Sequence, residues 1–309
     1  MTINPAIDVS CSVDHVFPNH KLRCGPGTYE AGGGGVNVAR AITQLGGASR
    51  ALYLAGGLTG KIFEDLLNQE GLFHQPVQIR GSTREDFSVI ESATGQQFRF
   101  VLPGPAIDES EWRGLLDRIA GLSPFPEFVV ASGSLAPGVP MDFYGRLATI
   151  VRGQGAKLVL DTSGEPLVKA MDVGVFLVKP SLRELRGLAG RDLAHEHDQE
   201  EAAREICKEG QAQIVVVSLG AAGVLLVSNG GCERMRSPTV AVKSKIGAGD
   251  SMVAGIVLSL ARGLGIGDAV RYGVAAGAAA VMREGTKLCA REDTDRLYLK
   301  MESAHTVPK

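Results

Sequence analysis

Continuous runs of Val, Ile and Leu mark the buried strands that the sequence predicts. After a first strand over 2–8, these runs lie at residues 51–55, 128–131, 158–161, 175–178 and 214–218. Runs without polar alternation are typical of strands that are covered on both faces. Between them, apolar residues recur at helical spacing, at residues 35–45, 59–70, 109–121, 141–152, 248–262 and 267–282. Strands that alternate with helices predict an α/β fold with a doubly wound, mostly parallel sheet.

Two segments depart from this alternation and predict a small second sheet. Residues 86–92 and 97–102 are strand-like runs around a Thr94–Gly95 turn. Phe98 and Phe100 alternate there with Arg99, which indicates a hairpin with two different faces. Together with the irregular stretch before residue 31, the hairpin predicts an antiparallel lid. We expect one domain over 1–309, with lid segments at about 10–31 and 84–102.

Charge and cysteine content narrow the classes of function. The 309 residues include 32 Lys and Arg against 34 Asp and Glu, and only 5% are aromatic. This balance provides no basic surface or stacking platform for nucleic acid. The five cysteines have no Cys-x-x-Cys spacing, which argues against a zinc site or a disulfide framework. The longest apolar run, 252–261, is about half a membrane span. We therefore expect a cytoplasmic protein with no nucleic-acid or membrane partner.

The segment Lys245–Ser251 predicts an anion site at the start of a long apolar helix. The backbone N–H groups of Gly247, Ala248 and Gly249 and the positive helix end would attract a phosphoryl group. Asp250 adds a carboxylate beside this site, where it could accept the proton of an attacking hydroxyl. This combination suits phosphoryl transfer. A glycine turn with an Asp N-cap explains the same residues equally well.

A second glycine run opens the helix that begins near residue 35. Residues 32–35 are all glycine, and Asn37 follows in the first helical turn. Glycines let a polyol approach the backbone, and the Asn carboxamide offers both a donor and an acceptor. The alternative is a plain glycine turn with a surface Asn.

Several polar residues follow predicted strands and would meet at one sheet edge. In an open parallel sheet, ligands bind beyond the carboxyl ends of the strands. Any one of these residues could be an ordinary polar loop residue, so only their joint placement indicates a site. They are Asp8, Ser134, Asp161, Lys179 and Ser218. The signatures of Walker A and dinucleotide-binding loops are absent from the sequence.

With both glycine motifs, the chain resembles the PfkB/ribokinase family of sugar kinases over its whole length. Further similar segments are Asn4–Asp8, Lys21–Cys24, Ser132–Leu135, Asp161–Glu165, Ser218–Gly220 and Gly285–Cys289. The resemblance implies a ribokinase-like core with a β-sheet lid that also forms a homodimer. It further implies MgATP as phosphoryl donor, Mg²⁺, and a monovalent cation such as K⁺.

The resemblance also implies roles for individual residues. Asp250 would be the catalytic base, with Gly247, Ala248 and Gly249 as the anion hole. Residues that would bind the sugar are Asp8, Gly33, Gly34, Asn37 and Ser134. Residues that would line the nucleotide are Lys179, Ser181, Ser218, Gly220 and Gly223. Glu184 would hold Mg²⁺, and the cation loop would comprise Ser244, Ile246, Ala280 and Gly285.

The acceptor implied by the resemblance is fructose 6-phosphate, phosphorylated on its C1 hydroxyl to fructose 1,6-bisphosphate. Relatives that act on fructose 1-phosphate or tagatose 6-phosphate usually carry a lysine in the first glycine run, which is all glycine here. Those two acceptors remain alternatives, as does a catalytically weak regulator that binds nucleotide and sugar phosphate. A phosphorylated acceptor requires a cationic clamp. Arg84, Arg23 and Lys21 are the candidates, with Lys21 also placed near a second nucleotide; alternatively, these charges only keep lid edges soluble.

One family motif is altered. The family's Asn-x-x-Glu reads Ser181-Leu182-Arg183-Glu184 here, so Glu184 is kept and the Asn is replaced. A Ser hydroxyl can still hold one of the waters that Mg²⁺ retains. We expect a changed dependence on Mg²⁺ or ATP and no loss of activity.

Overall fold

The main sheet of the protein has six strands and is parallel over most of its width. The structure is a computed structural model that describes residues 1–305, and the side chains of 1–302. The strand order is β12-β11-β10-β9-β8-β7, and the pairs from β7 to β10 are parallel. β11 and β12 add an antiparallel edge that the sequence did not predict. The bounds are β7 Phe128–Ser132, β8 Lys157–Asp161, β9 Val175–Val178, β10 Ala212–Ser218, β11 Val224–Ser228 and β12 Gly231–Met235.

The first two residues extend this sheet sideways. Ser132 N donates to the Met1 carbonyl, and Thr2 N donates to the Leu52 carbonyl. Beyond them lie the parallel strands β3 (Ala51–Ala55) and β4 (His74–Gln78). The predicted first strand over 2–8 is therefore wrong in its bounds, because residues 1–2 belong to the main layer and β1 begins later, at Ala6.

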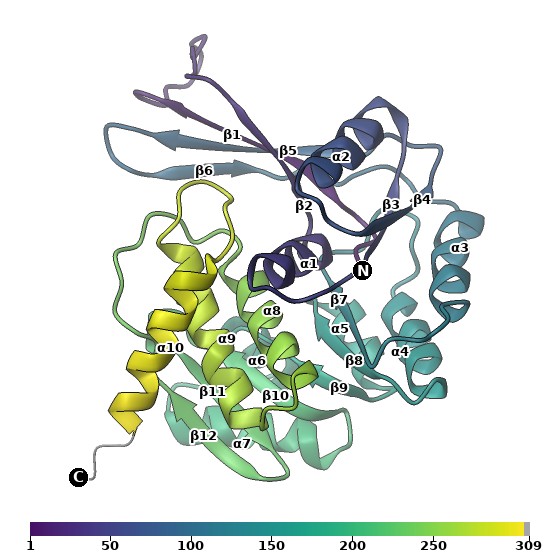
Figure 1. The fold of residues 1–309 in the computed structure, drawn as a ribbon, viewed down its shortest axis with the longest axis vertical. Coiled ribbons are helices and arrows are strands. Elements are labelled where there is room, and N and C mark those ends of the chain that lie inside the picture. Colours follow the sequence, from purple (N-terminus) through teal and green to yellow (C-terminus); the bar gives the residue numbers. More distant parts are fainter. Residues whose placement is uncertain (306–309) are drawn as a thin grey trace.

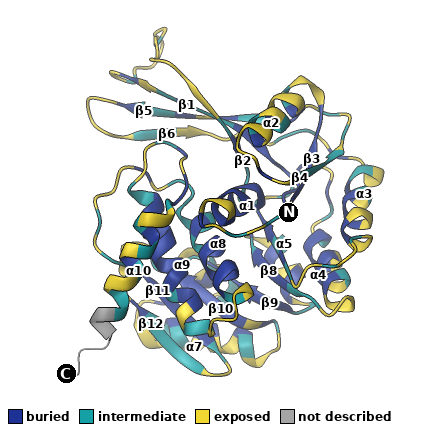
Figure 2. Cartoon of the chain, viewed as in Figure 1, coloured by how far each residue is buried: buried dark blue, intermediate teal, exposed yellow. Residues whose placement is uncertain are grey.

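Helices cover both faces of the sheet, as the continuous apolar runs predict (Figures 1 and 2). Leu158 and Leu160 of β8 pack with α3, α4 and α5, whereas Val159 between them packs with α1, α8 and α9. Because successive side chains of a strand point to opposite faces, a strand buried on both sides needs apolar residues at every position. The helix bounds are α1 Gly34–Gln44, α2 Gly57–Gln69, α3 Glu109–Ala120, α4 Phe143–Gly153, α5 Glu165–Met171, α6 Leu182–Ala189, α7 Glu196–Lys208, α8 Ala248–Ala261, α9 Ile266–Val281 and α10 Arg291–His305.

A second sheet of four strands lies across one end of the core, above α1 and α8 in Figure 1. Its order is β2-β1-β5-β6, with bounds β1 Ala6–Val13, β2 Thr28–Gly32, β5 Arg84–Glu91 and β6 Gln97–Phe100. The expected antiparallel pairing holds for β1–β2 and β5–β6. The central pair β1–β5 is parallel, a correction to that expectation. The sheet consists of two hairpins, β1–β2 and β5–β6, which pair through their first strands. These two strands can run parallel, and no turn residue in the sequence indicates such a pairing.

The two faces of this second sheet differ in polarity. Cross-strand partners Glu30, Asp8 and Asp86 form a row of carboxylates on the face where Asp86 is buried. The next row of cross-strand partners is apolar and points to the opposite face, and three of its four members are well exposed: Tyr29, Val9, Phe87 and Phe100. The polar face is turned toward the core and the apolar face away from it.

No helix within residues 1–305 combines the length and the apolar character that a membrane crossing demands.

Candidate active site

Asp250 lies in the first turn of α8, directly after the glycines that precede it. Gly247 caps the helix with φ 73°, a left-handed conformation that glycine adopts without strain. Burial and the charge of Asp161 raise the pKa of Asp250 to about 6, against the lowering effect of a hydrogen bond from Asn37. A carboxyl with this pKa is ionised near neutral pH and is still basic enough to accept a proton.

Asn37 joins the two glycine motifs in space. Its Nδ2 donates to Oδ2 of Asp250 at 2.9 Å, although the two residues are 213 positions apart. Asn37 is buried in the first turn of α1, which packs against α8. The two segments that the sequence singled out separately thus form one site.

The glycine run before α1 is required first by packing. A Cβ on Gly34 would lie 2.1 Å from the Ser132 hydroxyl, and Gly33 has φ 100°. A Cβ on Gly32 would lie 2.2 Å from Oδ2 of Asp8. The run therefore brings the start of α1 against β7 and against Asp8. This differs from the sequence-based reason, in which the glycines made room for a polyol.

Asp8 is the central member of the carboxylate row and the one without an ion pair in the described residues. Arg40 pairs with Glu30, and Arg84 pairs with Asp86 at 3.0 Å. Burial and repulsion from Asp86 raise the pKa of Asp8 to about 7, and Arg99 opposes this shift. Asp8 therefore keeps lone pairs free for hydroxyl donors from a ligand.

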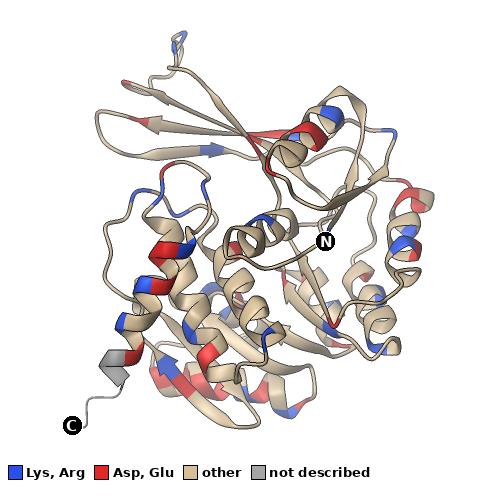
Figure 3. Ribbon diagram, viewed as in Figure 1, with Lys and Arg blue, Asp and Glu red and all other residues tan. Residues whose placement is uncertain are grey.

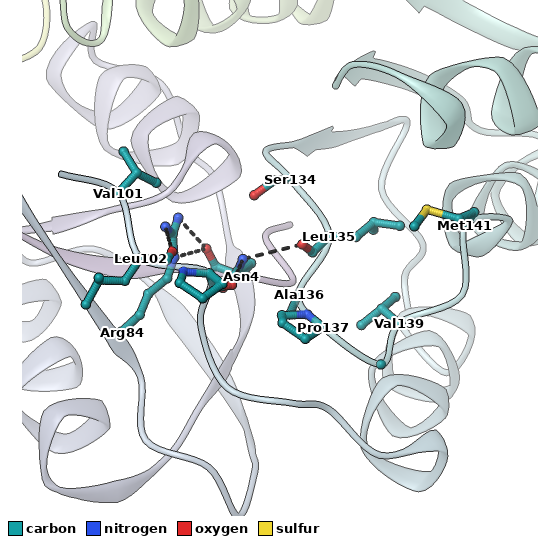
Figure 4. Close-up of a pocket in the computed structure, with 12 residues that line it drawn as sticks. Asn4, Arg84, Val101, Leu102, Ser134, Leu135, Ala136, Pro137, Val139 and Met141 are labelled. Carbon is teal, nitrogen blue, oxygen red and sulfur yellow. Dashed lines mark hydrogen bonds between the residues drawn. The ribbon is translucent and has the colours of Figure 1, made fainter. Parts of the chain in front are cut away.

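A pocket of about 460 Å³ opens between the loops that follow β6 and β7 (Figure 4). Arg84 and Ser134 line it on opposite sides, as the close-up shows. The Arg84 guanidinium already donates to the Asn4 and Leu102 carbonyls and to Asp86. A guanidinium has five N–H groups. Because Arg84 already makes these four hydrogen bonds to other protein groups, it keeps little capacity for a ligand.

Arg99 is a cation that the sequence analysis missed. It is exposed on β6, pairs across the sheet with Ser88, and shares the polar face. Its charge lowers the pKa of both Asp8 and Asp250, so it lies near both carboxylates. In Figure 3 the second sheet carries both blue and red segments, and β6 lies above the core helices. Within the described residues Arg99 has no ion pair of its own. The signal in the sequence was its position between Phe98 and Phe100, which alternate with it.

Lys179 and Asp161 form a buried ion pair beside the anion site. Their side chains meet at 3.2 Å, and a Cβ on Gly249 would lie 3.5 Å from Lys179 Nζ. Burial lowers the pKa of Lys179, but nearby carboxylates, Asp161 first, outweigh it and leave the pKa raised. Lys179 therefore stays charged next to the N-terminus of α8.

The residues predicted for the nucleotide lie along two adjacent strand ends. Ser181 and Ser218 form an isolated parallel bridge, and Gly220 and Gly223 turn the chain after β10. Ser181 caps α6: its hydroxyl accepts from Glu184 N, and Glu184 accepts from Ser181 N at 2.7 Å. The replacement of Asn by Ser thus keeps the cap of α6, and one oxygen of Glu184 stays committed to it.

The predicted cation loop is drawn from two segments that touch. Lys243 N and Ser244 N both donate to the Val281 carbonyl, which places the loop before α8 against the end of α9. The segments contain the predicted positions Ser244, Ile246, Ala280 and Gly285. Backbone carbonyls that converge from two such loops suit a monovalent cation.

Lys21 and Arg23 lie apart from these groups. Both are exposed in the 14–27 loop between β1 and β2, which projects beyond the second sheet in Figure 1. The cationic groups that act on Asp8 are instead Arg99, Arg40 and Arg84.

Comparison with known proteins shows the family to which the chain belongs. The profile of the pfkB family of carbohydrate kinases matches residues 2–293. The chain belongs to this family. Among pfkB-family relatives, the ATP-dependent 6-phosphofructokinase isozyme 2 of Mycobacterium tuberculosis is 47% identical over 298 residues, which cover 96% of this chain and 88% of the relative. The isozyme 2 of Escherichia coli is 40% identical, with 96% of each chain covered.

The fold agrees with solved pfkB-family structures. Phosphofructokinase-2 from Escherichia coli superposes with a TM-score of 0.93 in its complex with potassium and 0.92 in its complex with fructose-6-phosphate. Each comparison covers 97% of both chains at 40% identity. The predicted ribokinase-like α/β fold with a mostly parallel sheet is thereby confirmed, and so is the resemblance to sugar kinases.

Proposed function

We propose that the protein is an ATP-dependent 6-phosphofructokinase, which transfers the γ-phosphoryl group of MgATP to the C1 hydroxyl of fructose 6-phosphate. The observation that carries the proposal is Asp250, a buried carboxylate at the glycine-rich start of α8 whose pKa is raised to about 6. Support comes from the relatives at 40% and 47% identity, which carry this activity in their names. The products are fructose 1,6-bisphosphate and ADP.

In the proposed reaction, Asp250 accepts the proton of the C1 hydroxyl as its oxygen bonds to the γ-phosphorus. The bond between the γ-phosphorus and the bridging oxygen breaks, and its electron pair leaves with ADP. The N–H groups of Gly247, Ala248 and Gly249 and the charge of Lys179 stabilise the negative charge on the phosphoryl oxygens.

The acceptor is proposed to lie between the two sheets. Asp8 and Asn37 would bind sugar hydroxyls, together with backbone groups of Gly33 and Gly34. The phosphate of the acceptor would bind Ser134 and the remaining N–H capacity of Arg84 at the pocket. Arg99 would contact the same phosphate from the second sheet. This sheet of β1, β2, β5 and β6, which begins earlier than the predicted lid segments at about 10–31 and 84–102, would then act as a lid on a single domain and exclude water.

The donor is proposed to lie over β9 and β10. Lys179, Ser181, Ser218, Gly220 and Gly223 would line ATP. In the described part of the chain, no three metal-binding side chains are grouped closely enough to hold an ion by themselves. Mg²⁺ at such sites takes one or two carboxylates plus phosphate oxygens and waters, which fits Glu184 supported by Asp161. When bound, Mg²⁺ neutralises phosphate charge, and K⁺ on the loop of Ser244, Ile246, Ala280 and Gly285 would add a fixed positive charge near the anion hole.

A homodimer through the lid is also proposed. Tyr29, Phe87 and Phe100 are 56%, 41% and 55% exposed in a single apolar row on the outer face of the lid. An exposed apolar sheet face of this kind is typical of an interface. The Escherichia coli relative also forms a structure described as tetrameric and inhibited. Regulation of this chain through a second nucleotide near Lys21 and a cytoplasmic location stay predictions.

The test of the proposed reaction is Asp250→Asn, which keeps the shape of the side chain and removes its basicity. We expect kcat to fall roughly 10²–10⁴-fold, while ATP binding measured by calorimetry is retained. A variant that binds both substrates and keeps near-full turnover would show that Asp250 is not the catalytic base; Asp250 is not the N-cap of α8 either, since Gly247 holds that position.

A further inference from the structure

Arg40 is a buried cation next to the site that the reaction itself does not use. It lies on α1 three residues after Asn37 and is 4% exposed. Its five hydrogen bonds go to Glu70 Oε2 and Oε1 at 2.7 and 2.6 Å, Glu30 at 3.4 Å, the Ala31 carbonyl at 2.7 Å and Asn37 Oδ1 at 3.4 Å. A guanidinium has five N–H groups, so none remains for a ligand.

Arg40 determines which way the Asn37 carboxamide faces. Asn37 lies between the Arg40 guanidinium, which can only donate, and the Asp250 carboxylate, which can only accept. Only one orientation of the amide satisfies both neighbours, with Oδ1 toward Arg40 and Nδ2 toward Asp250. The reversed amide would set N–H groups against N–H groups and carbonyl oxygen against carboxylate.

The guanidinium is itself held by two other elements. Glu70, at the C-terminal end of α2, binds two of its nitrogens, and Glu30 and the Ala31 carbonyl belong to β2 of the lid. Glu30 also accepts a hydrogen bond from Thr286, in the loop before α10. A lysine has three donors on a flexible stem and cannot reproduce this fork.

We propose that Arg40 is a positioning residue that locks the carboxamide of Asn37 with its N–H toward Asp250. The proposal rests on the proposed function, in which Asp250 is the base. Loss of the lock lets the amide rotate and present its oxygen to Asp250. Because a hydrogen bond to the charged form favours that form, this rotation makes Asp250 harder to ionise.

The test is the pH dependence of kcat in Arg40→Lys, with Glu70→Gln as its matched control. Glu70→Gln weakens the ion pair at the other end of the same guanidinium and leaves the contact with Asn37 in place. In Arg40→Lys we expect the acid limb of the kcat profile to move up by about one pH unit. Turnover then falls roughly fivefold more at pH 6 than at pH 8. In Glu70→Gln, thermal stability drops and the acid limb stays at its wild-type position.

A triple variant covers the case in which Arg40→Lys does not fold. Arg40→Met with Glu70→Met and Glu30→Gln removes the guanidinium together with the charge of both carboxylates that pair with it, a replacement that is often neutral for stability; the same shift of the acid limb is expected. An unmoved acid limb in the folded Arg40 variants overturns the proposal, and so does an equal shift in Glu70→Gln. Full activity of Asp250→Asn would instead overturn the proposed function, so the two failures are distinguishable.

Discussion

Asp8 and Asp250 have raised pKa values for the same physical reason. Each carboxyl is largely buried and has a second carboxylate nearby, Asp86 for Asp8 and Asp161 for Asp250. In both pairs the second carboxylate is bound to a cation, Arg84 or Lys179. Asp86 and Asp161 are therefore neutralised by ion pairs, whereas Asp8 and Asp250 have no ion pair in the described residues. Asp8 and Asp250 can therefore accept a hydrogen bond or a proton from a ligand.

This pattern predicts how catalysis depends on pH. In the proposed mechanism both carboxyls act in their ionised form, and protonation follows as the pH falls through their pKa values of about 7 and about 6. We expect kcat/KM for the phosphosugar to be constant above about pH 8, to decline below pH 7 and to approach a slope of two at lower pH. The kcat profile at saturating phosphosugar should keep only the lower step.

Initial rates across pH 5–9 check this prediction, and Asp8→Asn should abolish the upper step of kcat/KM. A single midpoint at about pH 4, the ordinary value for aspartate, would contradict the account of both carboxyls.

Arg99 is the second prediction at the scale of the residue. Arg99→Met removes the one lid cation that acts on both Asp8 and Asp250 and has no ion pair in the described residues. Since a hydrogen bond to a charged group contributes about 1.5–3 kcal/mol, KM for the phosphosugar should rise roughly 10- to 100-fold. The KM for ATP should change much less. Arg113→Met, at an exposed position of α3, is the matched control; equal effects of the two substitutions in steady-state kinetics would refute the role of Arg99.

The sequence could identify Asp250 and Asn37 and could not identify Arg99. The first two lie in glycine-rich helix starts, whose backbone geometry is local and whose chemistry follows from residue type. Arg99 faces the site only because Phe87 pairs with Phe100 and Ser88 with Arg99 in the β5–β6 register. A shift by one residue would turn it to the opposite face.

At the scale of the element, β3 and the parallel strands β7 to β10 were predicted within one or two residues, because buried parallel strands leave a continuous apolar run in the sequence. The strands β4, β11 and β12 were missed. The lid was harder to predict. Its hairpin at β5–β6 followed from alternation, but the parallel pairing of β1 with β5 joins residues that are 78 positions apart, such as Asp8 and Asp86. That pairing creates the carboxylate row, and so the most distinctive electrostatic feature of the site depends on long-range topology.

The lid also carries a prediction about assembly. Phe87 lies in the middle of the outer apolar row, between Val9 and Phe100. Phe87→Glu places a charge in the proposed dimer interface, where burying it unpaired is costly. Sedimentation should show a dimer for the wild-type protein and a monomer for this variant. Leu58→Glu, on an α2 position that is 78% exposed, should leave the mass unchanged. A monomeric wild-type protein would contradict the proposed dimer.

At the scale of the whole molecule, the site depends on segments from the full length of the chain. Asp8 and Arg99 come from the lid, Asn37 from α1, Lys179 from the end of β9 and Asp250 from α8. The core brings α1 and α8 together, and the lid adds its polar face from above. In the proposed complex, the acceptor and donor would meet at Asp250 with both sheets around them, which would favour transfer to a sugar hydroxyl over transfer to water.

The central claim is that this site phosphorylates fructose 6-phosphate. The most direct measurement is ADP release with MgATP and K⁺ across fructose 6-phosphate, tagatose 6-phosphate, fructose 1-phosphate and unphosphorylated fructose. We predict the highest kcat/KM for fructose 6-phosphate and the lowest for fructose, which lacks the phosphate for Arg84, Arg99 and Ser134. Turnover with another phosphosugar only would contradict the proposed substrate. Saturable ATP binding without any turnover would contradict the proposed enzymatic activity.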